Sequence, residues 1–459
     1  MFEPKRKRNR KVPVGQASPS AVALRPVLDE WQAGLARLPV DVDQLARQTG
    51  ALRRKRAVKS GGDLLRLVLA YSWLDWSLRQ VGAWATTLEL AELSDVAVRK
   101  RLLNTRAWLS QLVGQALGQV RLSGRQSALR LRLIDATVIT QPGSTGTDWR
   151  VHVSFDVGRS CLDEWEVTDA QGGESLVRHA VAAGDILVAD RGYAHRAGLG
   201  HLLGSGAQTV VRTNGHNLPL ETARGQRLEL RAWLRGLAAG VKRRERAVWL
   251  TTPQGRFRLR LIAQRLPPAA AQAAARRSAK ASRKKGHTPS ALSRVMAGWV
   301  VLVSNLPAET WTAGDVLVLY RVRWQVELLI KRFKSLLDLD QLRSKHPELA
   351  QVYLLGKALG VLLDQYHQQQ VDAVSDWWDD TQRPLSVWRW TAFWLDQLRA
   401  LIRGSITRAM LQAALPKLGR YLRDSPRRRP QQLAVIRHWL RRLSLSQPTR
   451  ISDLGLAHA

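Results

Sequence analysis

The clearest pattern of apolar and polar positions lies between residues 319 and 337. At about 100° per residue, as in an α-helix, these residues separate onto two opposite faces. The apolar face is formed by Val322, Val326, Leu329, Phe333 and Leu337. The polar face is formed by Tyr320, Arg323, Glu327, Lys331 and Lys334. The pattern predicts a helix that buries its apolar face.

The polar face of this helix carries one carboxylate among three cations and a phenol. Arginine and lysine are common phosphate partners, so this face is suited to hold one anionic group beside something rich in phosphate. An ordinary amphipathic helix with a Glu–Lys pair four residues apart is the alternative. The helix alone does not decide between these two interpretations.

Residues 24–125 are predicted to be helical. An apolar run that begins at Leu64 is typical of a buried helix, and Ser94 is a favourable N-cap for the basic helix that follows it. Two short helices here resemble a helix-turn-helix, which places its second helix in the major groove of DNA. The candidate contacts on that helix are Arg99, Lys100, Arg101 and Arg106. A plain helical bundle with a basic surface is the alternative.

From about residue 128 the pattern changes to that of β-strands. The predicted strands are residues 128–140, 149–157, 161–169, 184–193, 207–213 and 299–305. Short helices are expected at 172–181 and 195–206, so three meandering strands precede alternating helices and strands. This order predicts a mixed α/β sheet.

Residues 214–298 interrupt the alternation of helices and strands. Arginine alternates with apolar residues at 228–236, 243–252 and 256–266, which favours β-hairpins. The Ala-rich and basic segment 269–290 is expected to be mobile and exposed to solvent. After residue 346 the chain is predicted to be helical again, for assembly, DNA contact or both.

Composition restricts the class of partner. The 459 residues carry 72 Lys and Arg against 37 Asp and Glu, a formal net charge of +35. Such an excess repels itself unless a polyanion neutralises it, and nucleic acid is the obvious one. An anionic membrane is disfavoured because the cations are spread along the chain. A lone cysteine, Cys161, excludes an intrachain disulfide, and we expect a soluble cytoplasmic protein.

Three carboxylates stand out as candidate chemistry. Asp135 interrupts the first predicted strand, Asp190 ends the fourth, and Glu327 lies on the amphipathic helix. A carboxylate at the end of a buried strand lies where open α/β sheets bind ligands, although either aspartate alone is equally suited to a turn. Acidic groups that converge need cations, and Mg²⁺ or Mn²⁺ suits oxygen ligands. No Cys/His cluster favours zinc.

These residues resemble the motifs of a known family, the DDE transposases of bacterial insertion sequences of the IS-four type. The signature Tyr-x₂-Arg-x₃-Glu-x₆-Lys is matched at every spacing by Tyr320, Arg323, Glu327 and Lys334. The segments IDATVI and ADRGY resemble the two Asp motifs and contain Asp135 and Asp190. The resemblance covers roughly residues 60–345.

The resemblance implies an α/β ribonuclease H-like catalytic domain with a β-rich insertion, flanked by N- and C-terminal helical regions. The expected segments are a basic disordered arm (1–23), a helical DNA-binding region (24–125), the first part of the ribonuclease H-like core (126–213), the insertion with its basic mobile segment (214–298), the second part of the core with the Glu helix (299–345) and a C-terminal helical region (346–459).

The resemblance also implies cut-and-paste transposition. Asp135, Asp190 and Glu327 would hold two Mg²⁺ ions, for which Mn²⁺ can substitute, and the site would nick the 3′ ends of the element and join them to target DNA. Tyr320, Arg323, Lys331 and Lys334 would contact phosphates. Trp299 would stack on a flipped base. The alternative is that Trp299 is a buried core residue. The partners are double-stranded DNA, at the terminal inverted repeats and the target, and a second copy of the chain in a homodimer. The location would be the bacterial cytoplasm, at the nucleoid.

Two alternatives remain open from the sequence. One is a metal-dependent nuclease that cuts DNA without rejoining it. The other is a catalytically inactive, transposase-derived regulator that only binds DNA. Retention of all three carboxylates argues against the regulator.

Overall fold

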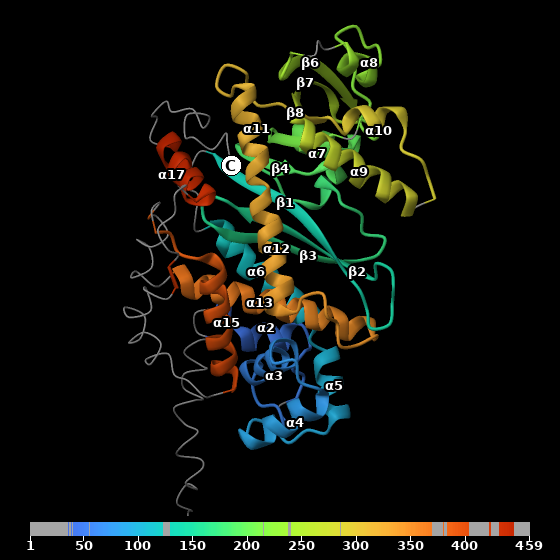
Figure 1. Cartoon of the computed structure of the whole chain (residues 1–459). Helices are drawn as coiled ribbons and strands as arrows, with labels where there is room; N and C mark the ends of the chain where they lie inside the picture. The colour runs from blue at the N-terminus through green and yellow to red at the C-terminus, as the bar shows by residue number, and fades with distance from the viewer. Residues whose placement is uncertain are drawn as a thin grey trace, which may run out of the picture.

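The structure describes most of the chain, and the rest is not discussed. The described residues are 40–54, 56–122, 129–213, 215–236, 240–284, 286–369, 383–403 and 431–444, with Leu35, Leu38, Asp380, Leu422 and Arg423. The predicted basic arm of residues 1–23 lies outside them, as do large parts of the predicted C-terminal helical region. In the computed structural model, a twisted sheet occupies the centre and upper half of Figure 1, and helices from both parts of the chain gather below it.

One sheet of eight strands forms the framework, in the order β3-β2-β1-β4-β5-β8-β7-β6. The strands are β1 (Arg130–Ile139), β2 (Trp149–Asp156), β3 (Cys161–Asp169), β4 (Asp185–Ala189), β5 (Gln208–Arg212), β6 (Arg243–Thr252), β7 (Gly255–Arg265) and β8 (Trp299–Ser304). The first three strands form an antiparallel meander, β4 is parallel to β1, and β5 is parallel to β4. The predicted mixed α/β sheet is therefore confirmed.

The N-terminal helices begin at well-formed caps. They are α2 (Val42–Gln48), α3 (Gly61–Trp73), α4 (Leu78–Thr87), α5 (Asp95–Leu103) and α6 (Arg106–Leu122). The side chain of Ser94 accepts a hydrogen bond from the backbone N–H of Ala97, so the predicted start of the basic helix is confirmed. Ser77 caps α4 in the same way. The predicted second helix ends at Leu103, and α6 begins after a short turn.

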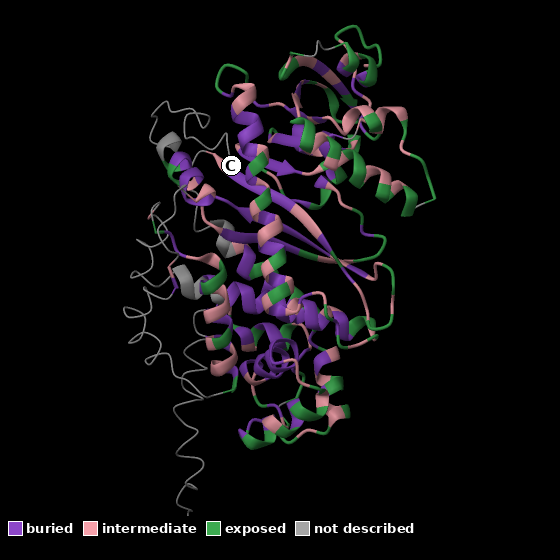
Figure 2. Ribbon diagram, in the orientation of Figure 1, coloured by how far each residue is buried: buried purple, intermediate pink, exposed green. Residues whose placement is uncertain are grey.

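The remaining elements complete two layers around the sheet. They are the 3₁₀ helices η1 (Leu176–Arg178) and η2 (Arg191–Tyr193) and the α-helices α7 (Arg196–Gly204), α8 (Leu230–Arg235), α9 (Pro268–Lys284), α10 (Ala291–Met296), α11 (Ala313–Val322), α12 (Trp324–Leu337), α13 (Pro347–Gln369), α15 (Val387–Arg403) and α17 (Gln432–Ser444). Side chains alternate along a strand, so Ile186 and Val188 enter one core while Leu187 and Ala189 enter another. Figure 2 shows buried residues, in purple, along the strands of the sheet.

The larger core joins the two ends of the chain. The helix α13 packs against α3 and α6, and α15 packs against α3 and α12. The indole N–H of Trp73 on α3 donates to the carbonyl of Gly356 on α13 over 2.8 Å. The guanidinium of Arg66, which is buried, donates to the last carbonyls of α15 at Leu401 and Ile402. The N- and C-terminal helices thus form one bundle beneath the sheet.

The insertion continues the sheet instead of forming a separate β structure. The hairpin β6–β7 pairs with β8, which also pairs with β5. One prediction in this region was wrong in detail, because residues 228–236, predicted to be strand, contain α8. The basic segment forms α9, and its mobility stays a prediction. None of the residues of α9 is buried, as expected for a helix that forms through the high helix propensity of alanine.

The predicted helix over residues 319–337 is divided at Arg323. Its backbone N–H donates to the carbonyl of Tyr320, and its carbonyl accepts from Val326, so hydrogen bonds to the third neighbour replace the α-helical pattern there. The predicted apolar face is buried at every position, which confirms the amphipathic interpretation. The interruption escapes a periodicity argument because Arg323 keeps right-handed helical dihedral angles, φ −51° and ψ −28°.

We expect the helical bundle to depend on the lack of a side chain at Gly360, in the middle of α13. A methyl group at Gly360 would overlap the indole of Trp73. Gly360→Ala should therefore lower the free energy of unfolding by about 1–3 kcal/mol. The control is Gly114→Ala on the exposed side of α6, where a methyl group meets nothing within 4 Å and should stabilise by up to about 1 kcal/mol. Urea unfolding followed by tryptophan fluorescence measures both, and equal stability of the two variants would contradict this packing.

Candidate active site

The pairing of β1 with β4 places two of the predicted carboxylates side by side. The two strands are parallel, and Ile134 lies opposite Ala189. The next residue on each chain segment is Asp135, which lies within β1, and Asp190, which directly follows the end of β4. The Asp190 carboxylate accepts a hydrogen bond of 2.7 Å from the backbone N–H of Gly192, which holds it at the start of η2. The Asp135 carboxylate accepts one of 2.9 Å from the N–H of Ala136.

The third carboxylate reaches the same place from α12. Glu327 lies in the first turn of that helix and pairs with the guanidinium of Arg323. The same guanidinium lies 3.7 Å from the Asp135 carboxylate. Arg323 and Asp135 are 14% and 17% exposed, so this contact is largely shielded from water. Arg323 therefore joins the helix carboxylate to the strand carboxylate, and it also lies over the ring of Tyr320, at 5.6 Å.

The ionisation of Asp135 reflects this crowding. The pKa of its carboxyl is raised to about 7, chiefly by burial, with smaller contributions from the negative charges of Asp190 and Glu327. The hydrogen bond from Ala136 and the charge of Arg323 act in the opposite direction. The three carboxylates predicted from the sequence are therefore close enough to influence one another.

A fourth carboxylate, which sequence reasoning missed, lies beside them. Burial, and then the charge of Asp190, raise the pKa of Glu174. A methyl group at Gly192 would overlap the Glu174 carboxylate, so only glycine leaves room for it. Tyr193 is buried beneath the cluster, and burial followed by the charges of Asp135 and its neighbours raises the pKa of its phenol well above the ordinary value. No periodicity marks Glu174, which lies in a turn between β3 and η1.

The donor set suits a hard divalent cation. It consists of four carboxylates and one guanidinium, which leaves negative charge to be neutralised, and carboxylate oxygens are the ligands that Mg²⁺ and Mn²⁺ prefer. Across the described part of the chain, no three acidic, histidine or cysteine side chains are placed to hold one ion as they stand. The guanidinium of Arg323 contacts oxygens of both Asp135 and Glu327. The carboxylates match the oxygen chemistry of a hard divalent ion, and Arg323 would compete with that ion for two of them.

Three further residues predicted for the site are Lys331, Lys334 and Trp299. Lys331 is exposed, and the ammonium of Lys334 lies 3.9 Å from the carboxylate of Asp340. Trp299 is 4% exposed and lies under the guanidinium of Arg265, 4.4 Å from the ring centre, so it faces the core.

The basic side chains predicted to contact DNA on α5 are Arg99, Lys100 and Arg101. In Figure 1, α5 lies at the bottom of the molecule, far from α11. The structure therefore does not bring them to the carboxylates. It leaves Arg99 and Lys100 exposed to solvent.

We expect metal-free protein to lose stability as the pH rises toward 7, through Asp135. Its pKa is raised on folding from 3.8 to about 7, so the folded chain binds the proton more tightly and ionisation opposes folding. Asp135→Asn removes this cost, which approaches about 4 kcal/mol at about 1.4 kcal/mol per pKa unit. In EDTA, the thermal midpoint of the variant should exceed that of the wild type at pH 8 and approach it at pH 4. A constant difference across this range would contradict the raised pKa.

Comparisons with known proteins identify the family. Residues 126–363 match the family described as Transposase DDE domain. The chain is 39% identical over 354 residues to a putative transposase, InsL, for the insertion sequence element IS186A of Escherichia coli strain K12, covering 75% of this chain and 95% of the relative. It is 39% identical over 355 residues to the transposase for IS421 of Escherichia coli, with the same coverage. A match of 36% over 104 residues, 23% of this chain and 22% of the relative, links it to the transposase for IS231F of Bacillus thuringiensis subsp. israelensis.

The described residues contain no helix long and apolar enough to cross a membrane. The family match spans all three motif carboxylates, which are Asp135 within β1, Asp190 directly after β4 and Glu327 of α12. The chain therefore belongs to the DDE transposases of insertion sequences, of the IS-four type, whose ribonuclease H-like domains act on DNA with divalent metal ions.

Proposed function

We propose that this transposase excises its insertion sequence and joins it to target DNA by two-metal phosphoryl transfer at Asp135, Asp190 and Glu327. One observation carries the proposal. The guanidinium of Arg323 contacts both Asp135 and Glu327, while the strand register sets Asp190 beside Asp135. A sheet aspartate and a helical glutamate thus share one cation, with the second aspartate beside them, which supports metal chemistry carried by carboxylates.

The metal ligands in this proposal are the three motif carboxylates, with Glu174 as a further oxygen donor. Two Mg²⁺ ions are proposed, and Mn²⁺ can replace them because both are hard cations that bind carboxylates. When bound, the ions supply the Lewis acidity that activates the attacking oxygen and stabilises the leaving oxygen of a phosphodiester. The half-exposed Glu327 and Asp190 face solvent, so DNA and ions have access to them.

Arg323 has two roles in the proposal. In the metal-free chain its guanidinium neutralises Asp135 and Glu327 and so holds together carboxylates that repel one another. If Asp135 and Glu327 held a metal ion, Arg323 would be free to contact a DNA phosphate, for which its planar fork is well shaped. Tyr320, Lys331 and Lys334 would contact neighbouring phosphates. Trp299 would need to leave the core to stack on a base.

The DNA-binding surface extends beyond the active site in this proposal. The net charge of +35 exceeds what a few phosphates can neutralise. The α4–α5 pair, with Arg99, Lys100 and Arg101 on α5, is proposed to bind the terminal inverted repeats, and two copies of the chain to act on paired ends as a homodimer. The ribonuclease H-like core is proposed to run through residues 126–213 and 299–345, with the insertion between them.

We expect the three motif carboxylates to be needed for cleavage but not for DNA binding. Asp135→Asn, Asp190→Asn and Glu327→Gln each remove a metal ligand while keeping side-chain shape, so cleavage of an inverted-repeat duplex in Mg²⁺ should fall by at least about 10³-fold. Glu309→Gln, an exposed carboxylate outside the site, is the control and should cleave normally. Products are resolved on a sequencing gel, and binding is measured by fluorescence anisotropy. Cleavage by all three variants would show that these carboxylates are not the metal ligands that cleavage needs.

The joining step separates transposition from simple cutting. Duplexes with precut 3′ ends, supplied with target DNA, should give strand-transfer products with the wild type. Cleavage without any transfer product would assign the chain to the nucleases that cut without rejoining.

We expect Arg323→Ala to have two effects of opposite sign. Loss of the competing cation should tighten Mn²⁺ binding several-fold in the absence of DNA, measured by calorimetry. Loss of a phosphate contact should weaken binding to the end duplex and reduce the slope of log affinity against log salt by about 1. Arg323→Lys, which keeps the charge, is the matched control and should change the salt slope little. An unchanged slope in Arg323→Ala would exclude Arg323 from the phosphate contacts.

A further inference from the structure

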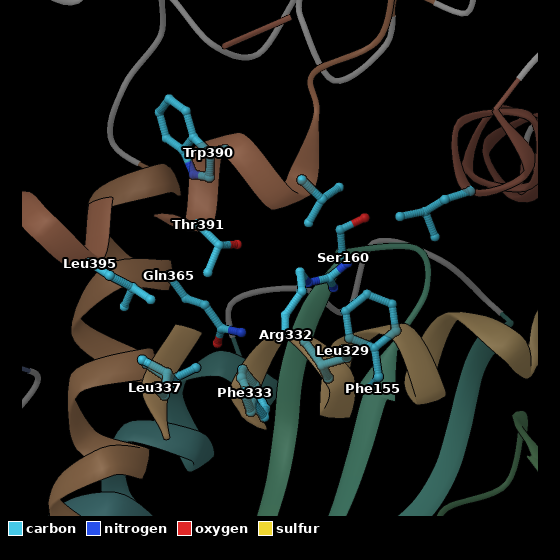
Figure 3. A pocket seen from close by; sticks show the side chains of 13 residues that line it. Phe155, Ser160, Leu329, Arg332, Phe333, Leu337, Gln365, Trp390, Thr391 and Leu395 are labelled. Carbon is cyan, nitrogen blue, oxygen red and sulfur yellow. The ribbon is translucent and has the colours of Figure 1, made fainter. Parts of the chain in front are cut away.

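A small pocket lies between the catalytic helix and the C-terminal helices. It is lined by residues of α12, α13, α15 and α17 and by the turn between β2 and β3, and it encloses about 50 Å³. Apolar walls come from side chains such as Phe155, Phe333 and Leu395. Polar groups of Arg332, Ser160, Gln365 and Thr391 surround the gap in Figure 3. A space of this size exceeds that of one water molecule, for which about 10–15 Å³ suffices.

Arg332 is the charged group of this pocket. It lies on α12, the helix that carries Glu327, and it makes no hydrogen bond or ion pair with any residue that the structure describes. Burial alone lowers the pKa of its guanidinium to about 10, and no acidic side chain offsets that shift. Arg332 is partly buried, and a cation that is partly removed from water and has no acidic partner favours an anion beside it.

Two further donors point to the same need. The hydroxyl of Ser160 and the indole N–H of Trp390 are both buried and have no hydrogen-bond partner. Ser160 adopts a left-handed conformation, with φ of 51°, which a residue other than glycine seldom accepts. Ser160 and Trp390 both line the same pocket as Arg332, so their N–H and O–H groups are available to a ligand there.

We propose that this pocket binds a small phosphate-like oxyanion, held by Arg332 with Ser160 and Trp390. The guanidinium fork matches the oxygens of such an anion, and the hydroxyl and indole supply further N–H and O–H donors. The volume suits a single phosphate-like group. The bound anion ties α12 to α15 and to the β2–β3 turn, so it stabilises the packing of the C-terminal helices on the catalytic helix. This site does not depend on the proposed metal chemistry.

The test uses the full-length protein and inorganic phosphate as the probe. Phosphate, against chloride at equal ionic strength, should raise the thermal midpoint of the wild type by several degrees, because a ligand that binds only the folded state stabilises it. Arg332→Met should abolish this shift and weaken phosphate binding in calorimetry by about 100-fold, the loss expected for two charge-assisted hydrogen bonds. Arg224→Met, an exposed arginine in the insertion, changes the net charge equally and should leave both results unchanged.

A second variant keeps the test independent of folding defects. Ser160→Gly relieves the left-handed strain and removes the hydroxyl, so it should raise stability in chloride and weaken phosphate binding by about tenfold. An anion site predicts that stability in chloride rises while phosphate affinity falls. A simple packing role for Ser160 predicts that stability and phosphate affinity change in the same direction. Phosphate that stabilises the wild type and Arg332→Met equally would overturn the proposal.

The anion has two sources, which the duplex distinguishes. If the phosphate belongs to the DNA backbone, Arg332→Met should also weaken duplex binding and lower its salt slope by about 1. If it is a free ion, duplex binding should be unchanged while phosphate binding is lost. Either result supports the oxyanion site and assigns its ligand.

Discussion

The parallel pairing of β1 with β4 is the constraint on which the active site depends. A shift of one residue would turn Asp135 to the opposite face of the sheet, away from Glu327. Buried charges hold the register. Arg132 on β1 is fully buried and contacts Asp185 on β4 at 3.2 Å, and it also contacts Asp163 and Glu164 on β3 at 3.1 and 2.9 Å. Removing one partner from such a network leaves a charge uncompensated, which strongly penalises any other register.

The candidate active site and the interior of the sheet both bring carboxylates close together. The negative charge is balanced differently in the two places. In the framework, the carboxylates around Arg132 are permanently paired and shielded, so they hold the strands. In the candidate active site, the carboxylates outnumber the one guanidinium, that of Arg323. The pKa of the Asp135 carboxyl is raised to about 7 there. The excess negative charge remains available for cations from solution. Burial and partner number, and not residue type, thus separate structural acids from those of the site.

Much of this arrangement follows from local patterns in the sequence. The strands around Asp135 and Asp190, the cap at Ser94 and the buried face of α12 all rest on alternation, helical period or capping chemistry, which act over a few residues. Long-range facts could not be predicted in this way. Neither Glu174 in its turn nor the absent partner of Arg332 leaves a local signal, because each depends on what distant elements place nearby. The helix α8 was mistaken for a strand because six residues are too few to distinguish the two periods.

The continuity of the sheet through β8 has a mechanical consequence. Because β8 is hydrogen-bonded to both β5 and β7, the hairpin of the insertion and the strands that carry the aspartates share one unbroken ladder. Such a ladder resists bending far better than a linker does. A force applied at the tip of the hairpin is therefore transmitted through the sheet to the strands that carry the aspartates. A molecule bound to the insertion would be held at a fixed position relative to Asp135.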